Sequence, residues 1–350
     1  MSSKTNIVQG QAVALMMTDT HLSKSNYELV VDIFQQAIDL CKAHKLSIVY
    51  HLGDFFTSRE AQPLNVLYEA KYIFSMFVEN NIELYIIPGN HDKVDLESEL
   101  SYLDVVEKNN AIHLISSEYD LMLSKEVNVL FLPYFKEKGS YLERLEKVTK
   151  LIRKDKKNIL LTHISINGVQ NNDGSGVENE IKQELFKKFD YVYVGHYHNK
   201  QDSGNIHYIG SSHQNNFGED SVKGFQFLMD DGSVKMIKSK FPEYIKEKIS
   251  IEDVEALKKF EKQHANSKNH VRVILTGEKT KLQAFKKENL IDKGIDVKFE
   301  NEEINTNIDI SNQEITIYDR SNIAKAFDKF IEINSIEDKQ YGLTLLEKIL

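Results

Sequence analysis

The sequence is poor in cysteine and proline, and it contains no long apolar run. A single cysteine, Cys41, among 350 residues excludes an intramolecular disulfide and a thiolate metal site. It also favours a reducing compartment. The first ten residues carry no apolar segment of the kind found in signal peptides. No apolar run approaches the roughly 18 residues of a membrane-spanning helix. We therefore expect a cytoplasmic protein with no membrane partner.

Four prolines and sixteen glycines are too few for a long disordered or collagen-like tract. The length allows one large domain and a smaller one. A net charge of −9 does not by itself suggest a nucleic-acid-binding protein. The charge is unevenly spread, however. Residues 241–300 carry 13 Lys and Arg against 11 Asp and Glu, whereas residues 301–350 carry 5 against 10.

The segment 1–242 alternates between short apolar runs, typical of buried strands, and longer stretches with helical periodicity. The strands are expected at 12–18, 47–52, 82–87, 127–132, 158–162, 191–194, 206–209, 224–229 and 233–239, and the helices at 27–42, 63–78 and 136–154. This alternation predicts an α/β fold in which helices cover sheets.

The pattern restarts after residue 242. Residues 243–300 predict a compact βαβαβ unit, with strands at 245–249, 271–276 and 297–300 and helices at 251–263 and 279–289. Residues 301–318 are polar and acidic and are expected to form a linker. Residues 319–350 contain two short amphipathic helical patterns. We therefore predict a domain at 1–242, a second at 243–300, a linker and a helical tail.

Polar residues follow five of the expected strands. They are Asp19 and His21 in Asp-Thr-His, Asp54 in Gly-Asp, Asn90 and His91 in Gly-Asn-His-Asp, His163 in Thr-His, and His196 and His198 in Gly-His-Tyr-His. Sites in α/β sheets form at the carboxyl ends of strands, so these side chains are expected to meet at one edge. Carboxylate, imidazole and amide oxygen ligands suit two divalent ions, and the two oxygens of Asp54 suit a bridge.

Backbone geometry suggests how these segments present their ligands. Residues i and i+2 of an extended segment share a face, so each Asp-x-His or His-x-His pair is expected to point to one side. The glycines at 53, 89 and 195 would allow tight turns beside the ions. Each segment alone is weak evidence, because most single histidines are structural. The presence of all five segments, in this order, argues against a purely structural interpretation. The remaining histidines, His44, His51, His113, His207, His213, His264 and His270, match no motif and are expected to be structural or exposed.

The ordered set D-x-H, G-D, G-N-H-D, H and G-H-x-H resembles the signature of the calcineurin-like metallophosphoesterase superfamily. Within it, segments 19–22, 53–60, 84–92, 207–211 and 224–225 resemble the nuclease subunits of double-strand-break repair complexes, of the bacterial SbcD type and its tailed-phage counterparts. The resemblance implies a four-layer α/β/β/α sandwich. It also implies a small capping and DNA-binding domain at 243–300 and a tail that binds an ATPase.

The resemblance also implies roles for single residues. One metal would be held by Asp19, His21, Asp54 and His198, and the other by Asp54, Asn90, His163 and His196. His91 would face the scissile phosphate and protonate the leaving group. Thr57 stands where family members often carry Asp or His. Arg59 occurs in phage relatives, where a phosphate contact and an ion pair with Glu60 are alternative roles.

The implied function is a DNA nuclease that uses Mn²⁺, with Mg²⁺ as the alternative. It would be a 3′→5′ exonuclease on duplex ends and an endonuclease on single strands. The tail would bind an SMC-like coiled-coil ATPase of the SbcC type, and two nuclease subunits would form a homodimer. The chain has no Gly-rich phosphate-binding loop, so we do not expect it to bind ATP itself.

Three alternatives stay open. A phosphatase or small-nucleotide phosphodiesterase would use the same fold and metals. A non-catalytic scaffold that only loads the ATPase is a second alternative. The third concerns segment 136–157, where nine Lys and Arg accompany four acidic residues. This segment is either a solvated helix face or a contact for the DNA backbone.

Overall fold

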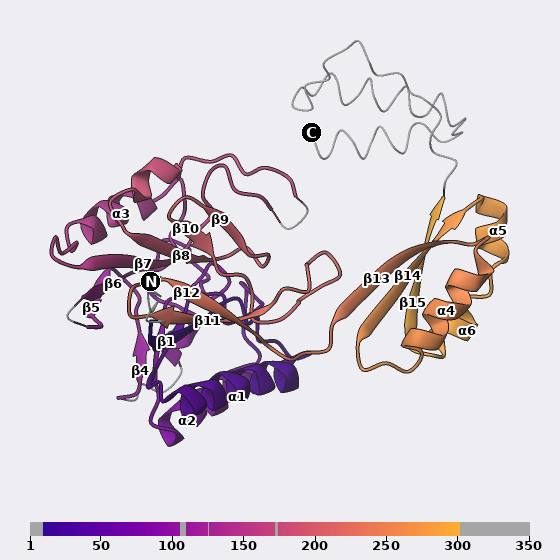
Figure 1. Ribbon diagram of the computed structural model, residues 1–350, viewed down its shortest axis with the longest axis horizontal. Coiled ribbons are helices and arrows are strands. Elements are labelled where there is room, and N and C mark those ends of the chain that lie inside the picture. Colours follow the sequence, from indigo (N-terminus) through magenta and orange to yellow (C-terminus); the bar gives the residue numbers. More distant parts are fainter. Residues whose placement is uncertain (1–9, 106–109, 125, 172–173, 302–350) are drawn as a thin grey trace, which may run out of the picture.

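The computed structural model describes residues 10–105, 110–124, 126–171 and 174–301, in a larger unit and a smaller three-stranded unit (Figure 1). The expected helical tail at 319–350 and nearly all of the expected linker at 301–318 lie outside these ranges. Within them, no helix has the length and apolar character needed to cross a membrane.

The first sheet of the larger unit contains six strands in the order β12-β11-β1-β2-β3-β4. Their bounds are β1 Ala12–Met17, β2 Ile48–His51, β3 Glu83–Ile86, β4 Ile112–Leu114, β11 Gly224–Met229 and β12 Val234–Lys238. Strands β1 to β4 run parallel, and β11 and β12 add an antiparallel edge. The parallel strands therefore end at the same edge of the sheet.

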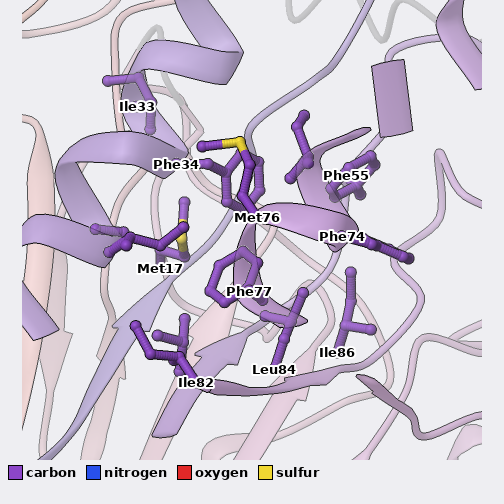
Figure 2. Close-up of a cluster of buried hydrophobic side chains, with 14 of the residues drawn as sticks. Met17, Ile33, Phe34, Phe55, Phe74, Met76, Phe77, Ile82, Leu84 and Ile86 are labelled. Atoms are coloured by element: carbon purple, nitrogen blue, oxygen red, sulfur yellow. The ribbon is translucent and has the colours of Figure 1, made fainter. Parts of the chain in front are cut away.

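Helices α1 (Tyr27–His44) and α2 (Leu64–Glu79) cover one face of this sheet. The buried residues of α1, from Val30 to Cys41, recur with helical spacing and make the apolar face that the sequence predicts. They pack with Phe74 and Phe77 of α2 and with Leu84 and Ile86 of β3 (Figure 2). Cys41 is fully buried in this core.

The second sheet also contains six strands, in the order β5-β6-β7-β8-β10-β9. Their bounds are β5 Tyr119–Met122, β6 Val127–Leu132, β7 Lys157–His163, β8 Tyr191–Gly195, β9 Gln201–Ser203 and β10 Ile206–Tyr208. One apolar cluster joins this sheet to the first, and another packs its outer face against α3 (Tyr141–Thr149). The layers follow the order helices, sheet, sheet, helix. The expected α/β fold is confirmed, with two mixed sheets.

The smaller unit contains the expected βαβαβ order. Its strands β13 (Tyr244–Ser250), β14 (His270–Gly277) and β15 (Ile295–Asn301) form a parallel sheet. Helices α4 (Val254–His264), α5 (Lys279–Ala284) and α6 (Glu288–Ile291) lie on the side of this sheet away from the larger unit (Figure 1). The open face of the sheet is therefore turned toward the larger unit.

Two expected helices are shorter in the structure. The helix expected at 279–289 is divided into α5 and α6, because Phe285 takes an extended conformation and packs against the small core. The helix expected at 136–154 begins only at Tyr141, because Glu97 accepts hydrogen bonds from the backbone N–H groups of Lys136 and Ser140 and holds the preceding turn. The short strands β4, β5 and β9 and the 3-10 turns Tyr102–Val105 and Gln183–Phe186 were not expected, since three or four residues carry too little periodicity.

Candidate metal centre

The loops that follow β1, β2 and β3 in the first sheet, and the ends of β7 and β8 in the second, meet at one place. There, Asp19, His21 and His198 form one group whose ligand atoms lie within 4.8 Å of one another. The Nε2 atoms of His21 and His198 are 3.0 Å apart, and each lies 3.8 Å from Asp19 Oδ1. Residues from distant parts of the chain thus place their metal-ligand atoms around a single point.

A second group contains Asp54, His163 and His196, again with ligand atoms within 4.8 Å of one another. Asn90 Oδ1 lies 3.1 Å from His163 Nε2 and 3.0 Å from His196 Nδ1. Asp54 Oδ2 is 3.4 Å from His163 Nε2 and 3.9 Å from His21 Nε2 of the first group. Asp54 therefore lies between the two groups.

The backbone presents these side chains differently from the expectation. Asp19 and His21 have φ values of 52° and 46°, Asp54 has 53°, and His196 has 90°. They occupy left-handed or positive-φ conformations, so the expectation of extended segments is wrong here. As a result, His196 and His198 do not share a face: His196 joins the second group and His198 joins the first.

The glycines beside the site have two separate roles. Gly53 has a φ of 93° and supplies the expected turn. At Gly89 the reason is space, because a Cβ atom would lie 2.2 Å from Asp54 Oδ1 and 2.3 Å from its backbone nitrogen. Gly195 would place a Cβ atom 2.4 Å from the Leu52 carbonyl oxygen. The close approach of these loops thus excludes any side chain at all three positions, since a Cβ atom at Gly53 would also lie 2.5 Å from His163 Nδ1.

Buried polar contacts hold the loops in register. The Asp92 carboxylate accepts hydrogen bonds from the backbone N–H groups of Phe55, Phe56 and Gly89, which joins the loops after β2 and β3. Burial, and then the nearby Asp54 carboxylate, raise the pKa of Asp92 to about 7. Asp92 was not among the predicted site residues, although it belongs to the Gly-Asn-His-Asp motif.

Burial and neighbouring charges shift the pKa values of the site residues in opposite directions. Burial disfavours a charge on His163, but Asp54 outweighs it and raises the pKa of His163 to about 9. Burial lowers the pKa of His196 to about 3 and that of His21 well below its usual value. Burial acts against the charged form of Asp54, yet His163 holds its pKa well below the usual value. Buried carboxylates beside imidazoles form a donor set suited to cations, and His163 would release its proton when it binds one.

His91 lies at the margin of both groups and is only partly buried. Its backbone N–H donates to Asp54 Oδ1 at 2.8 Å, and its Nδ1 donates to the Thr57 carbonyl at 2.5 Å. The other ring nitrogen of His91, Nε2, is therefore the one available for catalysis. It lies 3.0 Å from the Arg59 guanidinium. Among the described residues, Arg59 therefore pairs with His91, and the alternative pairing with Glu60 is not seen.

Thr57 contributes to the same arrangement. Its hydroxyl donates to the His21 carbonyl at 2.5 Å, and its own carbonyl orients His91. Thr57 therefore supports the site through both its hydroxyl and its backbone carbonyl.

Both groups open into a single pocket of about 840 Å³. Its walls include His91 and His213 from the larger unit and Tyr244 and His270 from the smaller one. His213 and His270 match no motif and were expected only to be structural or exposed; the structure buries His213, leaves His270 exposed, and places both in the pocket wall. His213 is buried, and both of its ring nitrogens lack a hydrogen-bond partner among the described atoms.

The basic segment 136–157 is largely neutralised. Arg144 forms ion pairs with Glu99 and Glu118, Lys147 with Glu143, Arg153 with Asp120, and Lys157 with Asp190. These contacts favour the solvated-face interpretation over a DNA contact.

Comparison with known proteins identifies the family. The model of the family described as calcineurin-like phosphoesterase matches residues 13–200. The chain belongs to this family. The matched segment contains all of the residues of both donor groups, so the phosphoesterase family and the two His/Asp groups support each other.

Two relatives of known function are more distantly similar to the chain. The chain is 25% identical over 233 residues to the DNA double-strand break repair protein Mre11 of Methanocaldococcus jannaschii, which covers 62% of each chain. It is 29% identical over 177 residues to the SbcD component of the nuclease SbcCD of Staphylococcus epidermidis, covering 43% of this chain and 46% of that one. The alignments thus span less than two thirds of these relatives. A dimetal phosphatase from Danio rerio is structurally similar, with a TM-score of 0.44, 10% identity, and coverage of 63% of this chain and 94% of that one.

Proposed function

We propose that this phosphoesterase is a metal-dependent DNA nuclease, acting as a 3′→5′ exonuclease on duplex ends and as an endonuclease on single strands. The observation that carries the proposal is the pocket shared by both donor groups and the smaller unit. A pocket with one wall from a second unit suits a polymer that continues beyond the scissile phosphate. The similarity to Mre11 and to the SbcD component of SbcCD favours DNA as that polymer.

The donor atoms suggest how two ions would be bound. Asp19, His21 and His198 would hold one ion, and Asn90, His163 and His196 the other, with Asp54 shared between them. Two divalent ions at these positions, Mn²⁺ or Mg²⁺, would act as Lewis acids on the phosphate and supply the nucleophile. Imidazole ligands on both sides favour Mn²⁺ over Mg²⁺, which prefers oxygen.

His91 would act on the leaving group. Its Nδ1–H is engaged by the Thr57 carbonyl and its Nε2 faces the Arg59 guanidinium, so His91 would first take up a proton from solvent at Nε2 and then pass it to the departing 3′ oxygen. Arg59 lies beside that nitrogen and would contact a phosphate oxygen that enters the pocket. His91 would then protonate the oxygen while Arg59 offsets the charge of the phosphate.

We infer two protein partners: an ATPase, from the resemblance, and a second copy of the chain, from one surface of the larger unit. The tail at 319–350 would bind an SMC-like coiled-coil ATPase of the SbcC type. Leu64, Tyr68 and Tyr72 recur every four residues along α2 and are 83%, 70% and 50% exposed. This apolar stripe suits the homodimer, because isolated apolar faces of this kind mark protein contacts.

Cleavage assays on the purified chain with Mn²⁺ test the proposal. Duplex DNA with labelled ends and single-stranded circles are compared with p-nitrophenyl phosphate, with and without the ATPase. Shortening from 3′ ends and nicking of circles are expected. Turnover of the small ester alone would favour the phosphatase alternative. Intact DNA in every condition, with Mn²⁺ bound, would favour the scaffold.

A further inference from the structure

A buried ion pair outside both donor groups lies directly against one of them. The carboxylate of Glu219 accepts a hydrogen bond from His198 Nδ1 at 2.7 Å, and its other oxygen lies 3.4 Å from the Lys223 ammonium. The side chains of Glu219 and Lys223 are both completely inaccessible to solvent. Taking two charges out of water is costly, so such a pair calls for a specific role.

The pair holds His198 at two points. Lys223 Nζ donates to the His198 carbonyl at 2.6 Å and to Asn199 Oδ1 at 3.0 Å. Glu219 is fixed in turn by the backbone N–H of Asn215 at 3.2 Å and the side-chain amide of Asn216 at 3.0 Å. Both the backbone and the ring of His198 are thus anchored by one segment, residues 215–223.

The same segment is attached to the smaller unit. Gln214 donates from its amide to the Glu219 carbonyl at 3.1 Å, and its amide oxygen accepts from the Tyr244 backbone N–H at 2.8 Å. The Phe217 ring meets the Tyr244 ring edge-on at 4.9 Å, and the Arg272 guanidinium lies 3.9 Å above Phe217. A continuous set of contacts therefore runs from β13 and β14 to His198.

We propose that Glu219 is the positioning residue for the metal ligand His198, and that the loop 213–219 makes metal binding at that ligand depend on the smaller unit. The proposal rests on the proposed function, since it takes His198 as a ligand. By accepting the hydrogen bond from Nδ1–H, Glu219 fixes the tautomer whose Nε2 lone pair faces Asp19 and His21. Contacts of Phe217 and Gln214 with the smaller unit keep Glu219 in place.

Glu219→Gln tests the first step. A glutamine with its oxygen toward His198 would place its NH₂ group against the Asn215 N–H and the Lys223 ammonium, which are both donors. In the reverse orientation its NH₂ group would face His198 Nδ1 and favour the wrong tautomer. In the metal-free protein, ¹⁵N spectra of labelled histidine should show the Nδ1–H tautomer of His198 in the wild type and its loss in the variant.

Calorimetry with Mn²⁺ supplies the second readout. Glu219→Gln should weaken one of two binding events by roughly ten- to hundredfold and leave the other unchanged. The weakened event should be the one that His198→Ala removes. The matched control is Asp220→Asn, which changes a carboxylate that lies 3.5 Å from Lys223 and is 43% exposed. It should bind both ions as the wild type does.

Phe217→Ala tests the attachment to the smaller unit and keeps the proposal open to refutation if Glu219→Gln does not fold. Circular dichroism first establishes that the variant is folded. The same binding event should weaken by roughly two- to thirtyfold, the range for residues along a contact network. Wild-type affinity in Phe217→Ala would refute the coupling, and wild-type affinity and tautomer in Glu219→Gln would refute the positioning role. A wild-type chain that binds no Mn²⁺ would instead refute the proposed function.

Discussion

At the scale of single residues, Asp54 joins the two donor groups. Its Oδ2 lies within 4 Å of one histidine from each group, and its Oδ1 accepts the backbone N–H of His91. The same carboxylate would therefore reach both prospective ions, and it contacts the residue that would act on the leaving group. Asp54 is only 2% exposed, so water cannot replace its carboxylate in these contacts.

Asp54→Ala should abolish cleavage and weaken both Mn²⁺-binding events, because a shared ligand is lost. Calorimetry measures the affinities, and circular dichroism reports on folding. Asp155→Ala, which changes a carboxylate that is 80% exposed, is the control and should behave as the wild type. Two binding events of native affinity in Asp54→Ala would show that the carboxylate does not bridge.

His91→Asn should separate chemistry from binding. The asparagine amide can offer a hydrogen bond to the phosphate but cannot release a proton, so we expect kcat to fall by about 10²–10⁴-fold. Mn²⁺ content and DNA affinity should be almost unchanged. The same exchange at His207, which pairs with Asp202 away from the pocket, should leave kcat intact.

The contrary outcome for His91→Asn is also specific. If His91 were a third imidazole ligand, the variant would lose one ion, and excess Mn²⁺ would restore much of its rate. Metal content and a Mn²⁺ titration of activity therefore distinguish an acid from a ligand.

At the scale of elements, the site is made by the loops that follow parallel strands. The positive φ values at Asp19, His21 and Asp54 turn the side chains inward, and the absence of a side chain at Gly89 lets two loops touch. Local backbone strain of this kind is common at functional sites and is sustained by surrounding contacts. Here the Asp92 carboxylate provides those contacts through three backbone N–H groups.

Gly89→Ala should disrupt the site through this loop contact. The new methyl group would collide with the backbone and side chain of Asp54, so we expect a loss of stability of about 1–3 kcal/mol. Mn²⁺ affinity should fall at both binding events. Gly176→Ala is the control, since its Cβ atom would meet no atom within 4 Å. Thermal denaturation with and without Mn²⁺ measures both effects, and equal melting temperatures for the two variants would contradict the expectation.

At the scale of the whole molecule, the smaller unit lines the pocket at the first residues of β13 and β14, where its open sheet face begins. Residues two apart on a strand share a face, so Tyr244, which lines the pocket, is followed by Lys246 and Lys248 on β13. Lys246 pairs in register with Arg272, and Lys248 pairs through Ile274 with Lys298. A basic surface therefore continues from the pocket, although Asp296 and Glu300 partly offset it.

Replacing Lys246, Lys248 and Lys298 together with glutamine should weaken duplex DNA binding. The slope of log K against log salt is negative and should become shallower by up to about 3, since each phosphate contact contributes about −0.9. Hydrolysis of p-nitrophenyl phosphate and Mn²⁺ affinity should not change. The matched control replaces Lys147, Arg153 and Lys157 on the larger unit, each of which forms an ion pair with an acid, as Lys248 does with Glu300. A larger effect from the control would move the DNA contact to segment 136–157.

The sequence by itself determined the α/β order, the βαβαβ unit and the seven prospective ligands, because strand and helix periodicity and the five motifs are local features. The helix bounds at α3, α5 and α6 were less accurate, because distant contacts such as those of Glu97 end or divide these helices.

Only the tertiary structure decided how the ligands are presented and what supports them. The family resemblance implied that His196 and His198 serve different ions, but the positive φ at His196 that turns the two side chains apart is not revealed by the sequence. Glu219, Lys223 and His213 reach the site from a segment with no motif, and their roles depend on burial and on contacts across the fold. The residues that would carry out the chemistry belong to local sequence motifs, whereas their positioning depends on residues that come close only after folding.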